Sequence, residues 1–149
     1  LVVEEMKDKP KSGNIVTEDG EILGKHNGLF NYTIGQRKGL GIAYKHPLYV
    51  IGFNGERNEV IVGPNARLFT NRMICKFYNF LDDTIHKELK AEGKIRYAAN
   101  PSPCTARILD DDTMEVIFEE PQRAITPGQS VAFYNGTQLL GGAVIDRVC

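Results

Sequence analysis

Turn signals recur at short intervals along this chain, and they constrain its fold more than any other feature. Asp19-Gly20, Asn54-Gly55 and Asn135-Gly136 each stand between two short runs rich in β-branched or aromatic residues. Such pairs favour the tight turns that join antiparallel strands, because Asn, Asp and Gly tolerate positive φ angles. We therefore expect positive φ at Asn54-Gly55. The spacing predicts three β-hairpins, over residues 14–23, 48–63 and 131–145.

The second half of the chain contains further short alternations of apolar and polar residues between Pro-, Gly- and Asp-rich turns. Residues 82–92 fit a helical turn or a variable loop, and Thr126-Pro127-Gly128-Gln129 fits a type II turn. At least five short strands within about 75 residues favour a small β-barrel, because closure hides strand edges. The strands predicted here cover residues 74–80, 94–98, 104–109, 114–118, 131–134 and 138–145.

Two domains follow from a break in the strand pattern at Gly63-Pro64-Asn65-Ala66. We expect a small antiparallel β domain over residues 1–68, in which residues 1–13 form a charged lead-in that stops at Pro10. Residues 69–149 form the predicted barrel. The predicted fold class is therefore mainly β.

Composition excludes several protein classes. The chain is 42% hydrophobic and 25% charged, as is typical of globular domains, so we do not expect disorder. It has no apolar run as long as a membrane span and no basic segment followed by an apolar one, so we expect a cytoplasmic location. A start at Leu1 instead of Met suggests a fragment of a longer protein.

Cysteine and histidine spacing gives no sign of a metal site or a disulfide framework. Three widely spaced cysteines, Cys75, Cys104 and Cys149, are expected to be reduced. Cys104 follows Pro103 with no nearby histidine or lysine, so a buried structural thiol is favoured over a nucleophile, and Cys75 is interpreted in the same way. The histidines stand alone, and we expect no metal.

The charges are segregated along the sequence, although the net charge is only −1. The stretch from Gly24 to His46 holds four cations and no acid, and Lys94 to Leu109 holds three cations and no acid. A basic face can therefore exist despite the net charge, and a local basic face is what binds phosphates.

A glycine-rich stretch over residues 33–41 brackets Gln36, Arg37 and Lys38 with three glycines. It fits a solvated turn or a nucleic-acid contact in which Arg37 and Lys38 meet phosphates and Gln36 meets a sugar or a base edge. It does not fit a dinucleotide-binding loop, because Tyr44 stands where the third glycine is needed. Apolar residues on both sides are expected to anchor the loop in the core: Leu29, Phe30, Tyr32, Ile34, Leu40 and Ile42.

Three motifs in order carry a family resemblance: residues 32–42 (YTIGQRKGLGI), 103–105 (PCT) and 126–136 (TPGQSVAFYNG). From about residue 13 to residue 145, the chain resembles the tRNA-specific 2-thiouridylases, the MnmA/TrmU family. That family has an amino-terminal ATP-pyrophosphatase domain, a central domain and a carboxy-terminal barrel like domain 2 of translation factors. The chain matches the last two, and we expect a six-stranded barrel. The family's nucleotide loop and its catalytic and sulfur-carrying cysteines have no counterpart here, and Cys104 falls at the structural Pro-Cys-Thr position.

The resemblance also implies function. The complete enzyme would adenylate the C2 oxygen of the wobble uridine in tRNA and replace it with persulfide sulfur, using ATP, Mg²⁺ and a sulfur-relay protein. This portion would position tRNA and be inactive alone. Arg96, Tyr97 and Gln129 match the family's tRNA contacts, whereas a tRNA role for Gln36, Arg37 and Lys38 is our inference. Two alternatives remain open: a structural module that closes over the ATP-pyrophosphatase domain, and a stand-alone translation-factor-like barrel.

Overall fold

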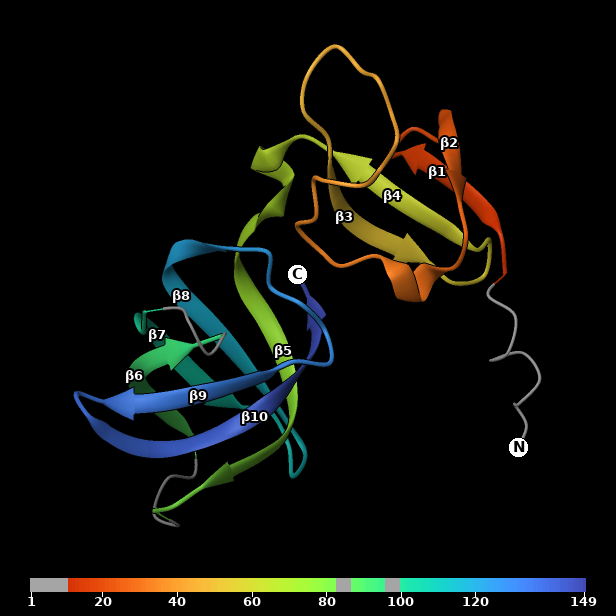
Figure 1. The fold of residues 1–149 in the computed structure, drawn as a ribbon. Coiled ribbons are helices and arrows are strands. Elements are labelled where there is room, and N and C mark those ends of the chain that lie inside the picture. Colours follow the sequence, from red (N-terminus) through yellow and green to blue (C-terminus); the bar gives the residue numbers. More distant parts are fainter. Residues whose placement is uncertain (1–10, 83–86, 96–99) are drawn as a thin grey trace. The chain divides into compact units, whose positions relative to one another are not determined.

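The computed structural model describes residues 11–82, 87–95 and 100–149. Strands dominate these residues, and the chain divides into two compact units, Leu1–Leu68 and Phe69–Cys149 (Figure 1). No helix in the described ranges is long and apolar enough to cross a membrane. Each unit has its own sheet and its own core, so each is described by itself.

The first unit is a four-stranded sheet built from two hairpins. Its strand order is β2-β1-β4-β3. Both hairpins occur where the turn signals predicted them, although the positive φ of the second turn is at Asn58 (55°) and not at Asn54 or Gly55. The elements are β1 (Gly13–Thr17), β2 (Ile22–His26), η1 (Leu29–Asn31), β3 (Tyr49–Asn54), β4 (Glu59–Gly63) and η2 (Asn65–Leu68).

The two hairpins meet through a parallel pair, β1 with β4. The sheet is therefore mixed, which corrects the expectation of a wholly antiparallel domain. The reason is the long connection over residues 27–48, which carries the chain around the core before β3 begins. Parallel neighbours require such a crossover, whereas the hairpin signals report only the local antiparallel pairs.

The core of the first unit lies under the sheet and is sealed by the connecting segment. Ile15, Val50 and Val60 are fully buried, and Leu40 and Leu48 from the connection pack against them. The remaining predicted anchors, Leu29, Tyr32, Ile34 and Ile42, are partly buried on this core.

Phe30 departs from that prediction, because its side chain is 94% exposed. It lies in η1, a single 3₁₀ turn. Residues three apart in such a turn share a side. Leu29 and Tyr32 both reach the core, and Phe30 projects away from it.

The second unit is a closed barrel of six strands, in the order β10-β5-β8-β7-β6-β9, which confirms the predicted six-stranded barrel. The turns at Gly128 (φ 92°) and Gly136 (φ 63°) use the glycine conformations that the sequence predicted. The strands are β5 (Phe69–Phe80), β6 (Glu88–Lys94), β7 (Ser102–Ile108), β8 (Thr113–Arg123), β9 (Ser130–Asn135) and β10 (Gln138–Val148).

Strand β6 occupies much of the segment that was expected to be a helical turn or a loop. Its residues, such as Glu88, Leu89 and Lys90, favour helices intrinsically, but pairing with β7 and β9 overrides that preference. Of the strand expected over residues 94–98, Lys94 belongs to β6, which ends at that residue. Residues 96–99 lie outside the described residues.

Alternating side chains from all six strands fill the barrel. Phe118 and Phe133 are at most 1% exposed, and Met73, Met114 and Ile145 pack with them. Cys75 and Cys104 belong to the same core, in agreement with their interpretation as buried structural thiols.

Candidate nucleic-acid interface

The glycine-rich stretch, residues 33–41, forms a loop of the first unit that is hydrogen-bonded to strand β3. Gly35, Gly39 and Gly41 have positive φ angles of 92°, 81° and 68°. The Gly35 N–H donates to the Val50 carbonyl at 2.8 Å, and the Val50 N–H donates to the Gln36 carbonyl at 2.9 Å. The loop is thus attached to the sheet at its base while its glycines turn the backbone outward.

Gln36 braces this loop through its carboxamide. Its Oε1 accepts the Thr33 N–H at 3.0 Å, and its Nε2 donates to the Lys38 carbonyl at 2.9 Å. Arg37 and Lys38, between these two contacts, are exposed. The structure therefore gives Gln36 a loop-shaping role, and its contact with a base or sugar stays a prediction.

Beside Arg37 lies an open groove of about 770 Å³ that is walled by residues 39–48. The Tyr44 and His46 rings meet edge to face, with centroids 5.0 Å apart, and the Lys45 ammonium lies 5.8 Å from the centre of the Tyr44 ring. None of the groove-lining residues is acidic. Tyr44 was not among the predicted site residues, although the acid-free stretch from Gly24 to His46 contains it.

A buried histidine holds the start of the same connecting segment. His26 is 1% exposed; its Nδ1 accepts the Gly28 N–H at 3.0 Å, and its Nε2 lies 2.7 Å from the Asn58 carbonyl oxygen. Since Nδ1 accepts a hydrogen bond, Nε2 must carry the proton and donate to Asn58. His26 therefore ties the connection to the β3–β4 turn.

In the barrel, the predicted contact Gln129 lies on an exposed turn before β9. Its N–H donates to the Thr126 carbonyl at 3.2 Å, and its own carbonyl accepts the Ile145 N–H at 2.8 Å. The turn is thereby fixed to β10, and the Gln129 side chain faces solvent. The other two predicted barrel contacts, Arg96 and Tyr97, lie outside the described residues.

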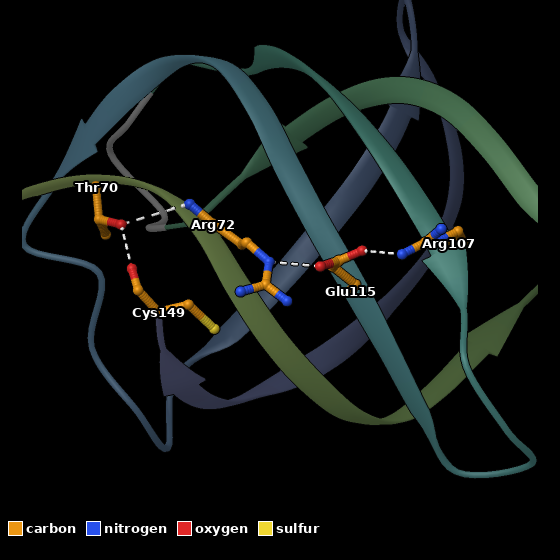
Figure 2. Close-up of polar contacts among 5 residues, drawn as sticks. All are labelled: Thr70, Arg72, Arg107, Glu115 and Cys149. Atoms are coloured by element: carbon orange, nitrogen blue, oxygen red, sulfur yellow. Dashed lines mark hydrogen bonds and ion pairs between the residues drawn. The ribbon is translucent and has the colours of Figure 1, made fainter.

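The barrel also carries a charged network that was not among the predicted sites. Glu115, on β8, is 4% exposed and binds two arginines: Arg72 of β5 through Nε and Arg107 of β7 through Nη2 at 2.7 Å (Figure 2). Arg107 and Glu115 are direct partners across the β7–β8 hairpin, so the turn signal could have paired them. The Arg72 contact joins residues 43 positions apart and has no local signal.

The network contributes to the acid response of the barrel. The hydrogen bond from Arg72 is the main cause that holds the pKa of Glu115 below its ordinary value of 4.5, with Arg107 acting in the same direction and burial opposing both. A carboxylate whose pKa is lower in the folded state stabilises the fold above its unfolded pKa, and this stabilisation is lost as the pH falls through the folded value.

We expect the free energy of unfolding of the barrel to fall below about pH 4.5 through this group. Chemical denaturation of the chain and of Glu115→Gln between pH 3 and pH 7 measures the effect. The variant should be less stable at neutral pH, and its stability should depend less on acid. Equal acid dependence in both proteins would show that Glu115 does not contribute.

The two buried barrel thiols, Cys75 and Cys104, are suited to packing and not to chemistry. Burial raises the pKa of Cys75 and of Cys104 to about 12. A nucleophilic cysteine needs its thiolate, which neither residue forms near neutral pH. The groove beside Arg37 offers cations and a ring, which can bind anions and planar rings.

Both units of the chain match known protein families. Residues 3–64 match the family model described as "tRNA methyl transferase PRC-barrel domain", and residues 70–145 match "Aminomethyltransferase beta-barrel domain". A protein of Clostridioides difficile named tRNA-specific 2-thiouridylase MnmA is 45% identical over 142 residues. The chain belongs to the tRNA-specific 2-thiouridylase family. Family members of the same name from Clostridium botulinum (Eklund 17B) and Carboxydothermus hydrogenoformans are 48% and 46% identical.

The shared region covers nearly all of this chain but a minor part of its relatives. The three matches include 95%, 93% and 92% of the chain, and 39%, 38% and 38% of the respective thiouridylases. The chain thus spans about two fifths of the length of these family members. It corresponds to the two domains that these family models describe.

Proposed function

We propose that this chain binds and positions tRNA within a tRNA-uridine 2-sulfurtransferase that thiolates C2 of the wobble uridine. The observation that carries the proposal is the identity of 45–48% with proteins named tRNA-specific 2-thiouridylases, over more than nine tenths of the chain. Identity at that level over two distinct domains is far more informative than a shared barrel fold.

The groove beside Arg37 supports a nucleic-acid role. Proteins bind RNA with cations that track the phosphates and with aromatic rings that stack on unpaired bases. Arg37 and Lys45 supply cations here, Tyr44 supplies a ring, and no carboxylate among the lining residues opposes them. Because Gln36 fixes the loop before any ligand arrives, binding would lose less conformational entropy.

The rest of the proposed reaction belongs to the remainder of such an enzyme. ATP, Mg²⁺ and a sulfur-relay protein would act there, in the cytoplasm, on the same tRNA that this portion binds. The sequence has no Gly-rich loop followed by Lys-Ser or Lys-Thr, and the family's own nucleotide loop has no counterpart in it. We assign it no catalytic step, and its contribution is to fix the register of the RNA.

The proposal is tested with the double variant Arg37→Gln/Lys38→Gln. We expect affinity for an unmodified tRNA transcript to fall about tenfold at low salt, and the slope of log K against log salt to shrink by about 2, because two phosphate contacts are lost. Fluorescence anisotropy over a salt series measures both. Arg57→Gln/Arg67→Gln is the matched control, since it removes two exposed, ion-paired arginines from the same unit.

If the control and the Arg37→Gln/Lys38→Gln variant bind equally, the loop has no special part in binding. If both keep the affinity and salt slope of the unaltered chain, these cations do not contact RNA. Gln129→Ala, on the barrel, tests the second predicted contact in the same assay. Its effect should be a loss of affinity without a change in salt slope, because the carboxamide is uncharged.

One observation favours a second candidate, a structural module that packs against the ATP-pyrophosphatase domain. Phe30 is 94% exposed, and a phenyl ring held in solvent is suited to burial against a protein partner. This role predicts association with the isolated catalytic domain without RNA, weakened by Phe30→Ser. Separate elution of the two proteins in gel filtration would contradict it. A stand-alone barrel remains the third alternative, and no feature of the described residues favours it.

A further inference from the structure

Glu115 places a buried carboxylate on the outer side of the barrel wall. Its neighbours along β8, Met114 and Val116, are fully buried in the core. Burial of a charge is costly unless the charge is paired and hydrogen-bonded. Both carboxylate oxygens are paired here, Oε2 with Arg72 and Oε1 with Arg107.

One arginine would suffice to neutralise this carboxylate, because a single guanidinium can bind both oxygens of a carboxylate. The barrel instead uses two, and each contributes one nitrogen. The side chains of Arg72 and Arg107 remain 48% and 59% exposed, whereas that of Glu115 is 5% exposed. The two arginines therefore carry one positive charge more than Glu115 alone, at the surface, and Arg72 also interacts electrostatically with Cys149.

The contacts with Glu115 leave donors on both guanidinium groups. Arg72 uses Nε, so its two terminal nitrogens are not consumed by the pair, and Arg107 uses only Nη2 (Figure 2). Each guanidinium has five N–H donors. Since Glu115 fixes both groups, a ligand would not have to order two flexible side chains.

Further cations lie on the same face. Directly paired residues on adjacent strands project to the same side of a sheet. One row contains Arg147, Ile74, Glu115, Arg107 and Glu88, and the neighbouring row contains Arg72, Ile117, Thr105 and Lys90. Across the two rows, four cations face two acids, of which Glu115 is buried.

We propose that Arg72 and Arg107, held apart by Glu115, form a phosphodiester clamp that binds an RNA backbone phosphate on the outer face of strands β5, β8 and β7. The proposal rests on the proposed tRNA-binding function and adds a site separate from the glycine-rich loop and from Gln129. Two guanidinium groups can direct N–H donors at the oxygens of one phosphate, which gives charge-assisted hydrogen bonds. Glu115 is a positioning residue that does not touch the RNA.

The test uses the full chain and an unmodified tRNA transcript, with binding measured over a salt series. We expect Arg107→Gln and Arg72→Gln each to weaken binding about tenfold at low salt and to reduce the salt slope by about 1. Arg107→Lys keeps the charge but loses the planar donors, and an intermediate loss is expected. Arg57→Gln serves as the charge control, since it also removes one exposed, ion-paired arginine.

The Glu115→Gln variant distinguishes a specific phosphate clamp from a general electrostatic attraction between the chain and RNA. The substitution makes the chain more positive by one charge, so a diffuse field would bind tRNA more tightly. The clamp predicts weaker binding, because the guanidinium groups lose the carboxylate that orients them. Thermal unfolding shows whether this variant is folded at the assay temperature, and the arginine variants carry the test if it is not.

The outcomes distinguish the clamp from the function on which it rests. If the unaltered chain does not bind tRNA, the proposed function fails. If the unaltered chain binds and both arginine variants match the control, or if folded Glu115→Gln binds more tightly, the clamp is overturned while tRNA binding stands. Weaker binding by Arg72→Gln, Arg107→Gln and folded Glu115→Gln, with the control unchanged, supports it.

Discussion

Replacing Gly141 with alanine is expected to destabilise the barrel by about 3 kcal/mol or more, because the added atom overpacks a site that cannot yield. A Cβ at this position would lie 2.2 Å from the Asn79 carbonyl oxygen and 2.8 Å from the Phe80 Cα. Both atoms belong to the backbone of β5, which pairs with β10 to close the barrel. Relief would therefore require the two strands to separate.

Denaturant unfolding of Gly141→Ala against the unaltered chain measures this loss. Gly52→Ala is the matched control, because a Cβ there meets no atom within 4 Å. The control is expected to change stability by less than about 1 kcal/mol. If Gly141→Ala loses no more stability than Gly52→Ala, then β5 and β10 do not approach as closely as the structure has them.

The second large effect is expected from Gly13→Ala in the small sheet. A Cβ there would lie 2.1 Å from the Asn58 carbonyl oxygen and 2.7 Å from His26 Nε2. These two atoms form the hydrogen bond that ties β2 to the β3–β4 turn. The substitution should cost about 3 kcal/mol, through overpacking together with loss of a buried hydrogen bond.

Amide hydrogen exchange measures the loss of stability in each unit separately. Gly13→Ala should lose protection in β1 to β4 and keep it in the barrel strands, because the two units have separate cores. Gly55→Ala is the control, since nothing lies within 4 Å of its added atom. Unchanged protection in β1 to β4 would contradict the described packing around His26.

Local signals explain how much of the fold could be predicted from the sequence. The turns at Asp19-Gly20, Gly128 and Gly136 depend on residues adjacent in the chain, and the hairpins at Asp19-Gly20 and Asn135-Gly136 formed as predicted. The parallel pairing of β1 with β4 depends on how residues 27–48 pack, which no local pattern encodes. Strand β6 shows the same limit, because its partners override the helical preference of its residues.

In the candidate site, too, only the features that depend on neighbouring residues could be predicted from the sequence. Exposure of Arg37 and Lys38 between flexible glycines was predictable, since a polar loop between apolar anchors must face solvent. The bracing role of Gln36 was not, because it depends on the fold of the loop itself. Arg72 also escaped prediction, since β5 and β8 are far apart in sequence.

The central claim is that this chain binds tRNA through phosphate contacts, and one titration tests it most directly. The unaltered chain is mixed with an unmodified tRNA transcript, and with a DNA duplex of similar length, at about 50 mM and about 200 mM salt. We predict saturable binding at low salt that weakens steeply at high salt and favours RNA over DNA, because A-form geometry and the 2′-hydroxyl distinguish them. Absence of tRNA binding at 50 mM salt, or binding that does not respond to salt, would contradict the claim.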